Sequence, residues 1–288
     1  MKAVKDAAPR AMRLTARAAA LALVMTGCVA AQPPVPDAQA SREEMARAYR
    51  AVMANGYLPR DEVPDSLLIN PPPPAEGSAA QARDEEAARA ALALYGSPRF
   101  RQAAVDAAMF NPDGSSVFSC TAGLRIAADT TPRLDALLKR ALPVLGLSTS
   151  PTKERYMRAR PFTVNGAPTC TPDQEAMLRT NGSYPSGHSA IGYGWGLIMA
   201  QVMPGRAAQM VARGREFGES RRICNVHWLS DVEEGRHVAA AVVARLQSLP
   251  EFQSDVTAAR AEIANLEKSA AASDCALERE AFALDSPN

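Results

Sequence analysis

The chain has 288 residues, of which 47% are hydrophobic and 22% are charged, and its formal net charge is +1. This composition is typical of a soluble globular protein with one domain, or with one domain and tails. The near-zero charge argues against a dedicated nucleic-acid-binding protein, which would carry a strongly basic surface.

Residues 1–31 have the pattern of a secretory signal peptide. Basic residues precede the apolar run "AAALALVMTG", which is followed by small residues and is too short to span a bilayer. Cleavage after residue 31 fits the small residues of "VAA", whereas cleavage after residue 27 fits a lipoprotein signal that ends before Cys28. We therefore expect a periplasmic or secreted protein, attached to a membrane only if Cys28 is lipidated.

The remaining cysteines are expected to form two disulfides, because an exported protein folds in an oxidising compartment. The sequence alone does not choose among the three possible pairings. No two of them have the C-x-x-C spacing of a zinc knuckle or a thiol redox motif. The four residues are Cys120, Cys170, Cys224 and Cys275.

Residues 32–83 are predicted to form a proline-rich tether and an N-terminal extension with one helix. That helix begins at Ser41, where Glu44 completes a capping box, and ends at Asn55-Gly56. The segment 58–78, "LPRDEVPDSLLINPPPPAEGS", is rich in proline, which lacks the amide donor that a helix needs. We expect it to lie extended over the protein.

From Asp84 the pattern predicts helices almost to the end of the chain. We expect helices over residues 84–95, from 97, from 131, and over 190–203, 227–246 and 256–272. The third has an apolar stripe with the spacing of a core-facing helix, formed by Leu134, Leu137, Leu138, Ala141 and Leu142. Alternating strand patterns are absent. The fold class is therefore an all-α bundle of about seven to nine helices, with a main domain over 84–275 and a tail over 276–288.

Chemistry is concentrated in three clusters, and the last of them, "SRRICNVHWLSD", contains a histidine–carboxylate pair. His227 and Asp231 are four residues apart, so on a helix they would share one face. A carboxylate that accepts a hydrogen bond from one ring nitrogen leaves the lone pair of the other nitrogen free to attack. An exposed pair of this kind on a helix would have no such role.

The second cluster, "SYPSGHS", is a loop that leads into a helix near Ser189. Gly187 has no Cβ, so the backbone amides can approach a ligand, and the free N–H groups of the helix favour an anion. The hydroxyl of Ser186 adds a donor, and His188 could protonate a leaving group. A simple turn with a capping serine is the alternative interpretation.

The first cluster, "KERYMRARP", supplies Lys153 and Arg160, and Arg221 of the third cluster adds another cation. Three fixed cations suit a phosphoryl group, whose charge is spread over three oxygens during transfer. Each of them alone would be an ordinary surface charge.

Together the clusters resemble the tripartite motif of the type-2 phosphatidic acid phosphatase superfamily, K-x6-R-P, P-S-G-H and S-R-x5-H-x3-D. The matching positions are Lys153 to Arg160-Pro161, Pro185 to His188, and Ser220-Arg221 to His227 and Asp231. "GSYPSGHS" further resembles the class A bacterial nonspecific acid phosphatases, in which threonine usually stands at the position of Ser189. The resemblance extends from about Tyr57 to about Leu246.

This resemblance implies the all-α helical bundle of that superfamily, with residues 84–275 as its catalytic domain. It implies an exported acid phosphatase that hydrolyses phosphate monoesters of broad range and can also transfer phosphate to alcohols. His227 would be the nucleophile and form a phosphohistidine, Asp231 would orient it, and His188 would protonate the leaving group. The phosphoryl oxygens would be held by Lys153, Arg160, Ser186, the Gly187 amide and Arg221. No metal or other cofactor is implied, and the partners expected are small phosphorylated substrates and a second copy of the chain.

Four alternatives stay open at this stage. A vanadium-dependent haloperoxidase uses similar residues to hold vanadate, and a lipid or pyrophosphate phosphatase would share the chemistry. An exported anion-binding protein could use the same residues without turnover. A metal site at His227, Asp231 and His237 is also conceivable, although His237 lies ten residues beyond His227 and is expected to be structural or exposed.

Overall fold

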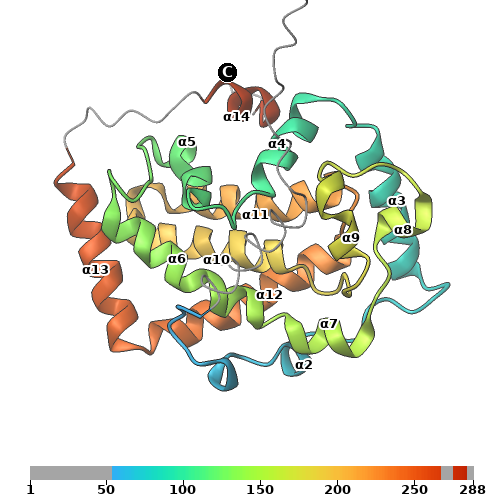
Figure 1. The fold of residues 1–288 in the computed structure, drawn as a ribbon, viewed down its shortest axis with the longest axis horizontal. Coiled ribbons are helices and arrows are strands. Elements are labelled where there is room, and N and C mark those ends of the chain that lie inside the picture. Colours follow the sequence, from blue (N-terminus) through green and yellow to red (C-terminus); the bar gives the residue numbers. More distant parts are fainter. Residues whose placement is uncertain (1–53, 267–274, 284–288) are drawn as a thin grey trace, which may run out of the picture. The chain divides into compact units, whose positions relative to one another are not determined.

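All regular secondary structure is helical in the parts of the chain that the computed structural model describes, residues 54–266 and 275–283 (Figure 1). Seven helices have nine or more residues, and these are α3 (Ala79–Leu92), α4 (Pro98–Asp106), α6 (Pro132–Leu147), α10 (Gly187–Val202), α11 (Ala207–Ile223), α12 (Leu229–Gln247) and α13 (Pro250–Ala264). The shorter ones are α2 (Ser66–Ile69), α5 (Ser119–Ala122), α7 (Ser150–Tyr156), α8 (Pro161–Asn165), α9 (Glu175–Leu178) and α14 (Ala276–Ala281). The predicted all-α fold class is confirmed. The signal peptide, the tether and the helix expected from Ser41 lie outside the described residues.

Helix α10 lies at the centre of the bundle, in contact with α6, α11, α12 and α13 (Figure 1). It is apolar around most of its circumference, and Trp195 is completely buried. The Trp195 indole nitrogen donates a hydrogen bond of 2.8 Å to the carbonyl oxygen of Leu138 on α6. This is the buried core helix that the apolar run 190–203 predicts. None of the described helices combines the length and apolarity needed to cross a membrane.

The close crossing of α10 and α11 depends on glycine. A Cβ atom on Gly196 would lie 2.7 Å from the carbonyl oxygen of Met210, and one on Gly214 would lie 2.8 Å from that of Gly192. Real Cβ atoms do not approach a backbone so closely, and therefore any side chain would push the helices apart. This crossing fixes the first turn of α10 relative to the C-terminal half of α11, the two elements that carry His188 and Arg221.

The proline-rich segment and two helix boundaries differ from the prediction. Segment 58–78 contains the short helix α2, which Asp65 caps by accepting a hydrogen bond of 2.9 Å from the Leu67 amide. Helix α3 begins at Ala79 rather than Asp84, because the Ser78 hydroxyl caps it by accepting a bond from the Gln81 amide. Helix α13 begins at Pro250, the first-turn position that favours proline, rather than at residue 256. The predicted core stripe on α6 is confirmed, because all five of its side chains are buried.

The four remaining cysteines form two disulfides, as the sequence predicts, and the structure selects Cys120–Cys275 and Cys170–Cys224. The first joins α5 to the segment that opens α14, and α14 packs on α4. Glu278 on α14 also accepts a hydrogen bond from the buried Arg213. Residues 276–281 are therefore a docked helix, where the sequence had indicated a tail.

Candidate active site

Ser186 and Gly187 lie where the loop 181–186 enters α10. The Ser186 hydroxyl accepts a hydrogen bond of 3.2 Å from the Ser189 amide, so it caps α10, and the helix begins at Gly187 rather than near Ser189. The amides of the first turn have no partner within the helix and make this end electropositive. The loop is held against α12, because the Ser186 amide donates to the Asp231 carbonyl oxygen over 2.8 Å.

Lys153 on α7 lies beside this loop. A Cβ atom on Gly187 would lie 4.0 Å from the Lys153 Cε, so the lysine stem passes directly by the glycine. The ammonium group donates to the carbonyl oxygens of Gly182 and Ser183 at 2.9 and 3.2 Å. Burial lowers the pKa of this ammonium well below its usual range, and the charge of Arg160 adds to the effect. A bound anion would have the opposite effect and stabilise the charged form.

Arg160 is buried, and its guanidinium joins three separate segments. It donates to the carbonyl oxygens of Leu178, Gly182 and Val226 at 2.9, 3.2 and 3.0 Å, and to the side chain of Asn181. Its Nη1 also lies 3.1 Å from the Nε2 atom of His227. Burial lowers the pKa of Arg160 to about 10. This cation is therefore already fixed by the protein, in contact with the proposed nucleophile.

Arg221 on α11 is completely buried, and none of its three guanidinium nitrogens has a hydrogen-bond partner among the described residues. Burial and the charge of Arg160 lower its pKa to about 9, against the opposing effect of Asp106. A buried cation without hydrogen-bond partners is costly unless a ligand supplies them. Arg221 therefore indicates a binding site for an anion.

His227 and Asp231 form the expected pair, although His227 is not on the helix. It precedes α12, whose N-cap is Trp228, and Asp231 lies in the first turn. The Nδ1 atom of His227 is 3.3 Å from the Asp231 Oδ2 atom, which also accepts a bond of 2.9 Å from the Trp228 amide. The carboxylate reaches His227 because it caps the helix.

Two side chains beside the His227 ring, Asp231 and Arg160, favour one tautomer, and the backbone of Ser183 also hydrogen-bonds to the ring. An ionised carboxylate only accepts and a guanidinium only donates, so Nδ1 carries the proton and Nε2 the lone pair. Burial lowers the pKa of His227 well below its usual range, as do the charges of Arg160, Lys153 and Arg221. The imidazole is therefore neutral and nucleophilic at Nε2.

His188 is the second residue of α10, and its ring lies between backbone and an aromatic side chain. Its Nε2 atom is 3.2 Å from the Ala107 carbonyl oxygen, and the Phe110 ring meets it edge to face at 5.3 Å between centroids. Burial lowers its pKa well below the usual range, and the charge of Arg221 lowers it further. Because the Ala107 oxygen only accepts, Nε2 carries a proton and Nδ1 is the nitrogen left for proton transfer.

Two residues that the sequence analysis did not single out, the half-buried Arg158 and the buried Asp84, complete the surroundings of Asp231. The Nη1 atom of Arg158 is 2.6 Å from the Asp231 Oδ1 atom, and its Nη2 atom is 2.7 Å from the Oδ2 atom of Asp84. The one signal for Arg158 was its position in the first cluster, two residues before Arg160. Asp84 appeared only as the expected start of a helix, and no local pattern connects it to Asp231.

Ser220 of the third cluster has a structural role. Its hydroxyl donates to Asp106 over 2.5 Å and accepts a bond of 2.9 Å from Arg99. Asp106 is also paired with Arg213, at 2.6 Å. This network holds the turn of α11 that presents Arg221, and Asp106 immediately precedes Ala107, the partner of His188.

His237 is separate from this cluster. Its side chain is 64% exposed, and its Nδ1 atom pairs with Glu234 at 3.1 Å. The described residues contain no group of three or more histidine, cysteine or acidic side chains placed to hold a metal ion. The structure thus gives no support to the metal interpretation of His227, Asp231 and His237.

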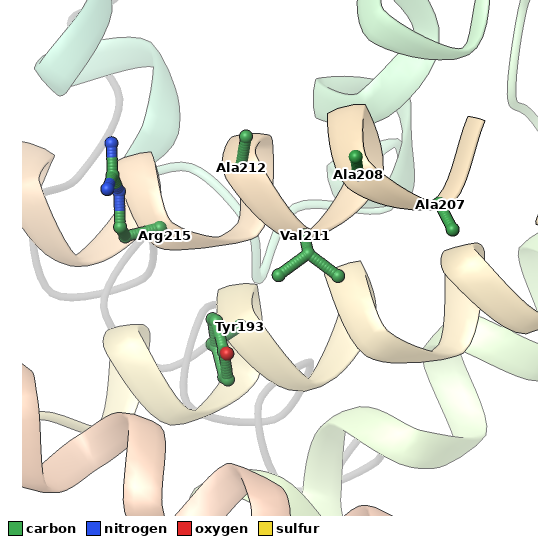
Figure 2. A pocket seen from close by; sticks show the side chains of 6 residues that line it. All are labelled: Tyr193, Ala207, Ala208, Val211, Ala212 and Arg215. Atoms are coloured by element: carbon green, nitrogen blue, oxygen red, sulfur yellow. The ribbon is translucent and has the colours of Figure 1, made fainter.

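A surface groove of about 530 Å³ lies between α10 and α11 (Figure 2). Its lining is mostly small and apolar: Tyr193, Ala207, Ala208, Val211, Ala212 and Arg215. None of these is a candidate site residue. A second hollow of about 350 Å³ has Arg158 and Arg160 in its lining and so reaches the flank of the site.

Comparisons with known proteins identify relatives of this chain. Residues 138–253 match the model of the PAP2 superfamily. The chain is 42% identical over 208 residues to the non-specific acid phosphatase of Salmonella typhimurium, which covers 72% of this chain and 83% of the relative. It is 39% identical over 213 residues to that of Providencia stuartii, covering 74% and 86%. It is 36% identical over 220 residues to an acid phosphatase of Zymomonas mobilis, covering 75% and 83%.

Proposed function

This chain belongs to the PAP2 superfamily and is an acid phosphatase, and we propose that it cleaves phosphate monoesters through a phosphohistidine at His227. The observation that carries the proposal is the buried Arg221, which has no hydrogen-bond partner among the described residues, in the same site as the His227–Asp231 pair. An anion satisfies Arg221, and a neutral histidine beside it can attack that anion.

In the first step, the substrate phosphoryl group is held by the cations and by the amides at the start of α10. Arg221 and Lys153 offer N–H donors, and the Gly187 amide adds another. The Nη1 donor of Arg160 transfers from the Nε2 atom of His227 to a phosphoryl oxygen, and the freed Nε2 lone pair attacks phosphorus as the bond to the ester oxygen breaks. Asp231 accepts the Nδ1–H bond throughout, which stabilises the ring as it becomes positively charged.

The departing oxygen needs a proton, and His188 supplies it. The proton leaves the Nδ1 atom of His188, while its Nε2–H group stays hydrogen-bonded to the Ala107 carbonyl oxygen. In the second step, the neutral His188 takes a proton from water. The resulting hydroxide attacks phosphorus, and His227 is released as a neutral imidazole with free phosphate. An alcohol in place of water would give phosphotransfer.

The acid preference of the enzyme follows from the protonation states that this sequence of steps requires. His188 must be charged and His227 neutral at the start, although burial lowers the pKa of both imidazoles. A bound phosphate dianion opposes this lowering, and His188 gains its proton at mildly acidic pH.

The proposal includes export to the periplasm or beyond. The pattern of residues 1–31 and the two disulfides support export. The mass of the mature N-terminus would distinguish cleavage after residue 31 from lipidation of Cys28. A homodimer is also proposed, to be measured by sedimentation. Neither bears on the chemistry of the site.

The covalent intermediate is the direct test. We expect wild-type enzyme, mixed with ³²P-labelled p-nitrophenyl phosphate and denatured in alkali, to retain label that acid removes, because phosphohistidine is stable in base and labile in acid. His227→Ala should retain none and lose turnover, whereas His237→Ala, the exposed histidine, should behave as wild type. Labelling of His227→Ala equal to wild type would overturn the phosphohistidine. Oxidation of bromide by enzyme with vanadate and peroxide, without phosphatase activity, would favour a haloperoxidase.

A further inference from the structure

Asp231 has a second charged neighbour besides His227. Its Oδ2 atom accepts from the Trp228 amide and faces the His227 ring, while its Oδ1 atom is 2.6 Å from the Nη1 atom of Arg158. The other arm of the guanidinium, Nη2, is 2.7 Å from Asp84 on α3. We propose that Arg158 and Asp84 are positioning residues, which hold Asp231 in the one orientation that fixes the His227 ring for attack.

Asp231, Arg158 and Asp84 depend on one another for charge compensation, because they are largely shielded from water. The side chains of Asp231 and Asp84 are 0% and 1% exposed, and that of Arg158 is 13% exposed. Removal of one partner from such a group leaves a charge without compensation in a medium that solvates it poorly. Arg158 is the only one of the three that is positive, so it balances both carboxylates.

Asp84 is in turn fixed by the first turn of α12. It accepts hydrogen bonds from the Ser230 amide at 2.7 Å and from the Ser230 hydroxyl at 2.6 Å. The same hydroxyl accepts a bond of 2.8 Å from Arg158. Helix α3 is thereby tied to the turn that carries Asp231, and Arg158 cannot move without breaking contacts on both sides.

Two arginines in one motif thus act on opposite sides of the nucleophile. Arg160 lies 3.1 Å from the Nε2 atom of His227, whereas Arg158 contacts the Asp231 carboxylate behind the ring. The Arg158 guanidinium also lies over the Trp228 ring, 5.4 Å from its centroid, which covers it from one face. Arg158 therefore acts through Asp231 and does not bind the phosphoryl group.

The planar guanidinium of Arg158 is essential for holding Asp231 and Asp84 together. Its two terminal nitrogens reach two carboxylates at once, in a fixed plane, whereas a lysine ammonium is a single point charge on a flexible stem. Lysine at position 158 would keep the charge and lose the bridge, and glutamine would lose both. These two substitutions separate the contribution of charge from that of geometry.

The inference rests on the proposed role of His227, so the experiment measures the attack step. Arg158→Gln and Arg158→Lys are compared with wild type and with Arg155→Gln, which removes an exposed charge from the same motif. We expect Arg158→Gln to lower kcat and the single-turnover rate of phosphoenzyme formation about 10- to 100-fold, the size of effect seen when the hydrogen-bond partner that orients a metal-ligating histidine is removed. KM and the inhibition constant of inorganic phosphate should stay within about 3-fold, because the anion-binding groups remain. Arg158→Lys should recover part of kcat, and Arg155→Gln should match wild type.

Two results would overturn the inference. One is an Arg158→Gln enzyme with the kcat of Arg155→Gln. The other is a loss of kcat that is matched by an equal loss of phosphate binding, which would make Arg158 part of the anion site. If Arg158→Gln does not fold, Arg158→Lys decides, and wild-type kcat in that variant would refute the bridge. Failure of the wild type to form a phosphoenzyme would instead refute the proposed mechanism.

Discussion

The Nδ1 atom of His227 lies 3.3 Å from the Oδ2 atom of Asp231, on the side of the ring opposite the guanidinium of Arg160. The imidazole is therefore held between a group that only accepts and a group that only donates. These two contacts favour the tautomer with the proton on Nδ1 without any contribution from substrate, so the lone pair of Nε2 is oriented before the substrate arrives.

Asp231→Asn should lower kcat by about three to four orders of magnitude, as in triads where the corresponding substitution allows the wrong tautomer. An amide can turn its NH₂ group toward Nδ1, which would move the proton to Nε2 and remove the attacking lone pair. The measurements are kcat with p-nitrophenyl phosphate and the tautomer of ¹⁵N-labelled His227 by NMR. A variant that keeps both wild-type kcat and the Nδ1–H tautomer would contradict this account.

Arg221→Met should abolish activity and at the same time stabilise the phosphate-free protein. Replacement of a buried, uncompensated charge by an apolar side chain of similar length is expected to raise the free energy of unfolding by about 1–3 kcal/mol. Arg213→Met on the same helix is the control, because Arg213 is buried but paired with Asp106 at 2.6 Å, and its loss should cost about 3–5 kcal/mol.

Phosphate provides a second measurement for the same pair. Inorganic phosphate should raise the Tm of the wild type and leave that of Arg221→Met nearly unchanged, since binding to the folded state stabilises it by an amount that grows with the logarithm of the ratio of phosphate concentration to Kd. Thermal unfolding with and without phosphate distinguishes the two variants. Equal stabilisation of wild type and Arg221→Met would mean that Arg221 is not in the anion site.

Much of this site could be predicted from the sequence because its residue spacings are local. Lys153 and Arg160 share one short segment, as do His227 and Asp231, and the loop at Ser186 directly precedes its helix. Asp84 and Arg158 are 74 residues apart, and only the tertiary packing of α3 against α12 and of the segment between α7 and α8 against both brings them to Asp231. The disulfide pairing depends on the same kind of long-range contact. His227 was placed on a helix in error because a carboxylate four residues on also suits a helix cap.

His188→Ala should affect substrates according to how much their leaving group needs a proton. An alkyl phosphate releases a basic alkoxide, and its kcat should fall about 10²- to 10⁴-fold, the usual contribution of a general acid. 2,4-Dinitrophenyl phosphate releases a stable anion and should lose far less in the burst of phosphoenzyme formation. Rapid-quench measurement of that burst isolates the first step, and His237→Ala is the control. Equal losses for both substrates would assign His188 to binding alone.

Stability of the phosphate-free protein should fall as the pH drops below about 6.5. Burial lowers the pKa of both His188 and His227 in the folded state, while in the unfolded chain their pKa is about 6.5. The unfolded state therefore binds more protons between that pH and the lower folded pKa values, and protonation favours unfolding across this window. Tm should be highest above pH 6.5, and phosphate should reduce the slope below it. The double variant His188→Asn/His227→Asn should have a shallower slope, and an unchanged slope would refute this origin.

The Cys170–Cys224 disulfide joins the segment before α9 to the end of α11, and both of its ends lead to partners of Arg160. Leu178 lies eight residues after Cys170 and Val226 lies two residues after Cys224. The carbonyl oxygens of Leu178 and Val226 accept hydrogen bonds from the Arg160 guanidinium. The double substitution Cys170→Ala/Cys224→Ala should therefore lower kcat as well as cost about 4 kcal/mol of stability, as expected for a sequence separation of 54. Cys120→Ala/Cys275→Ala is the control, because it opens the longer separation of 155 and costs about 5 kcal/mol, yet neither end leads to Arg160. Both variants are assayed well below their Tm values, and Cys170→Ala/Cys224→Ala should lose more kcat than Cys120→Ala/Cys275→Ala. The opposite order would show that the Cys170–Cys224 disulfide stabilises the fold without organising the site.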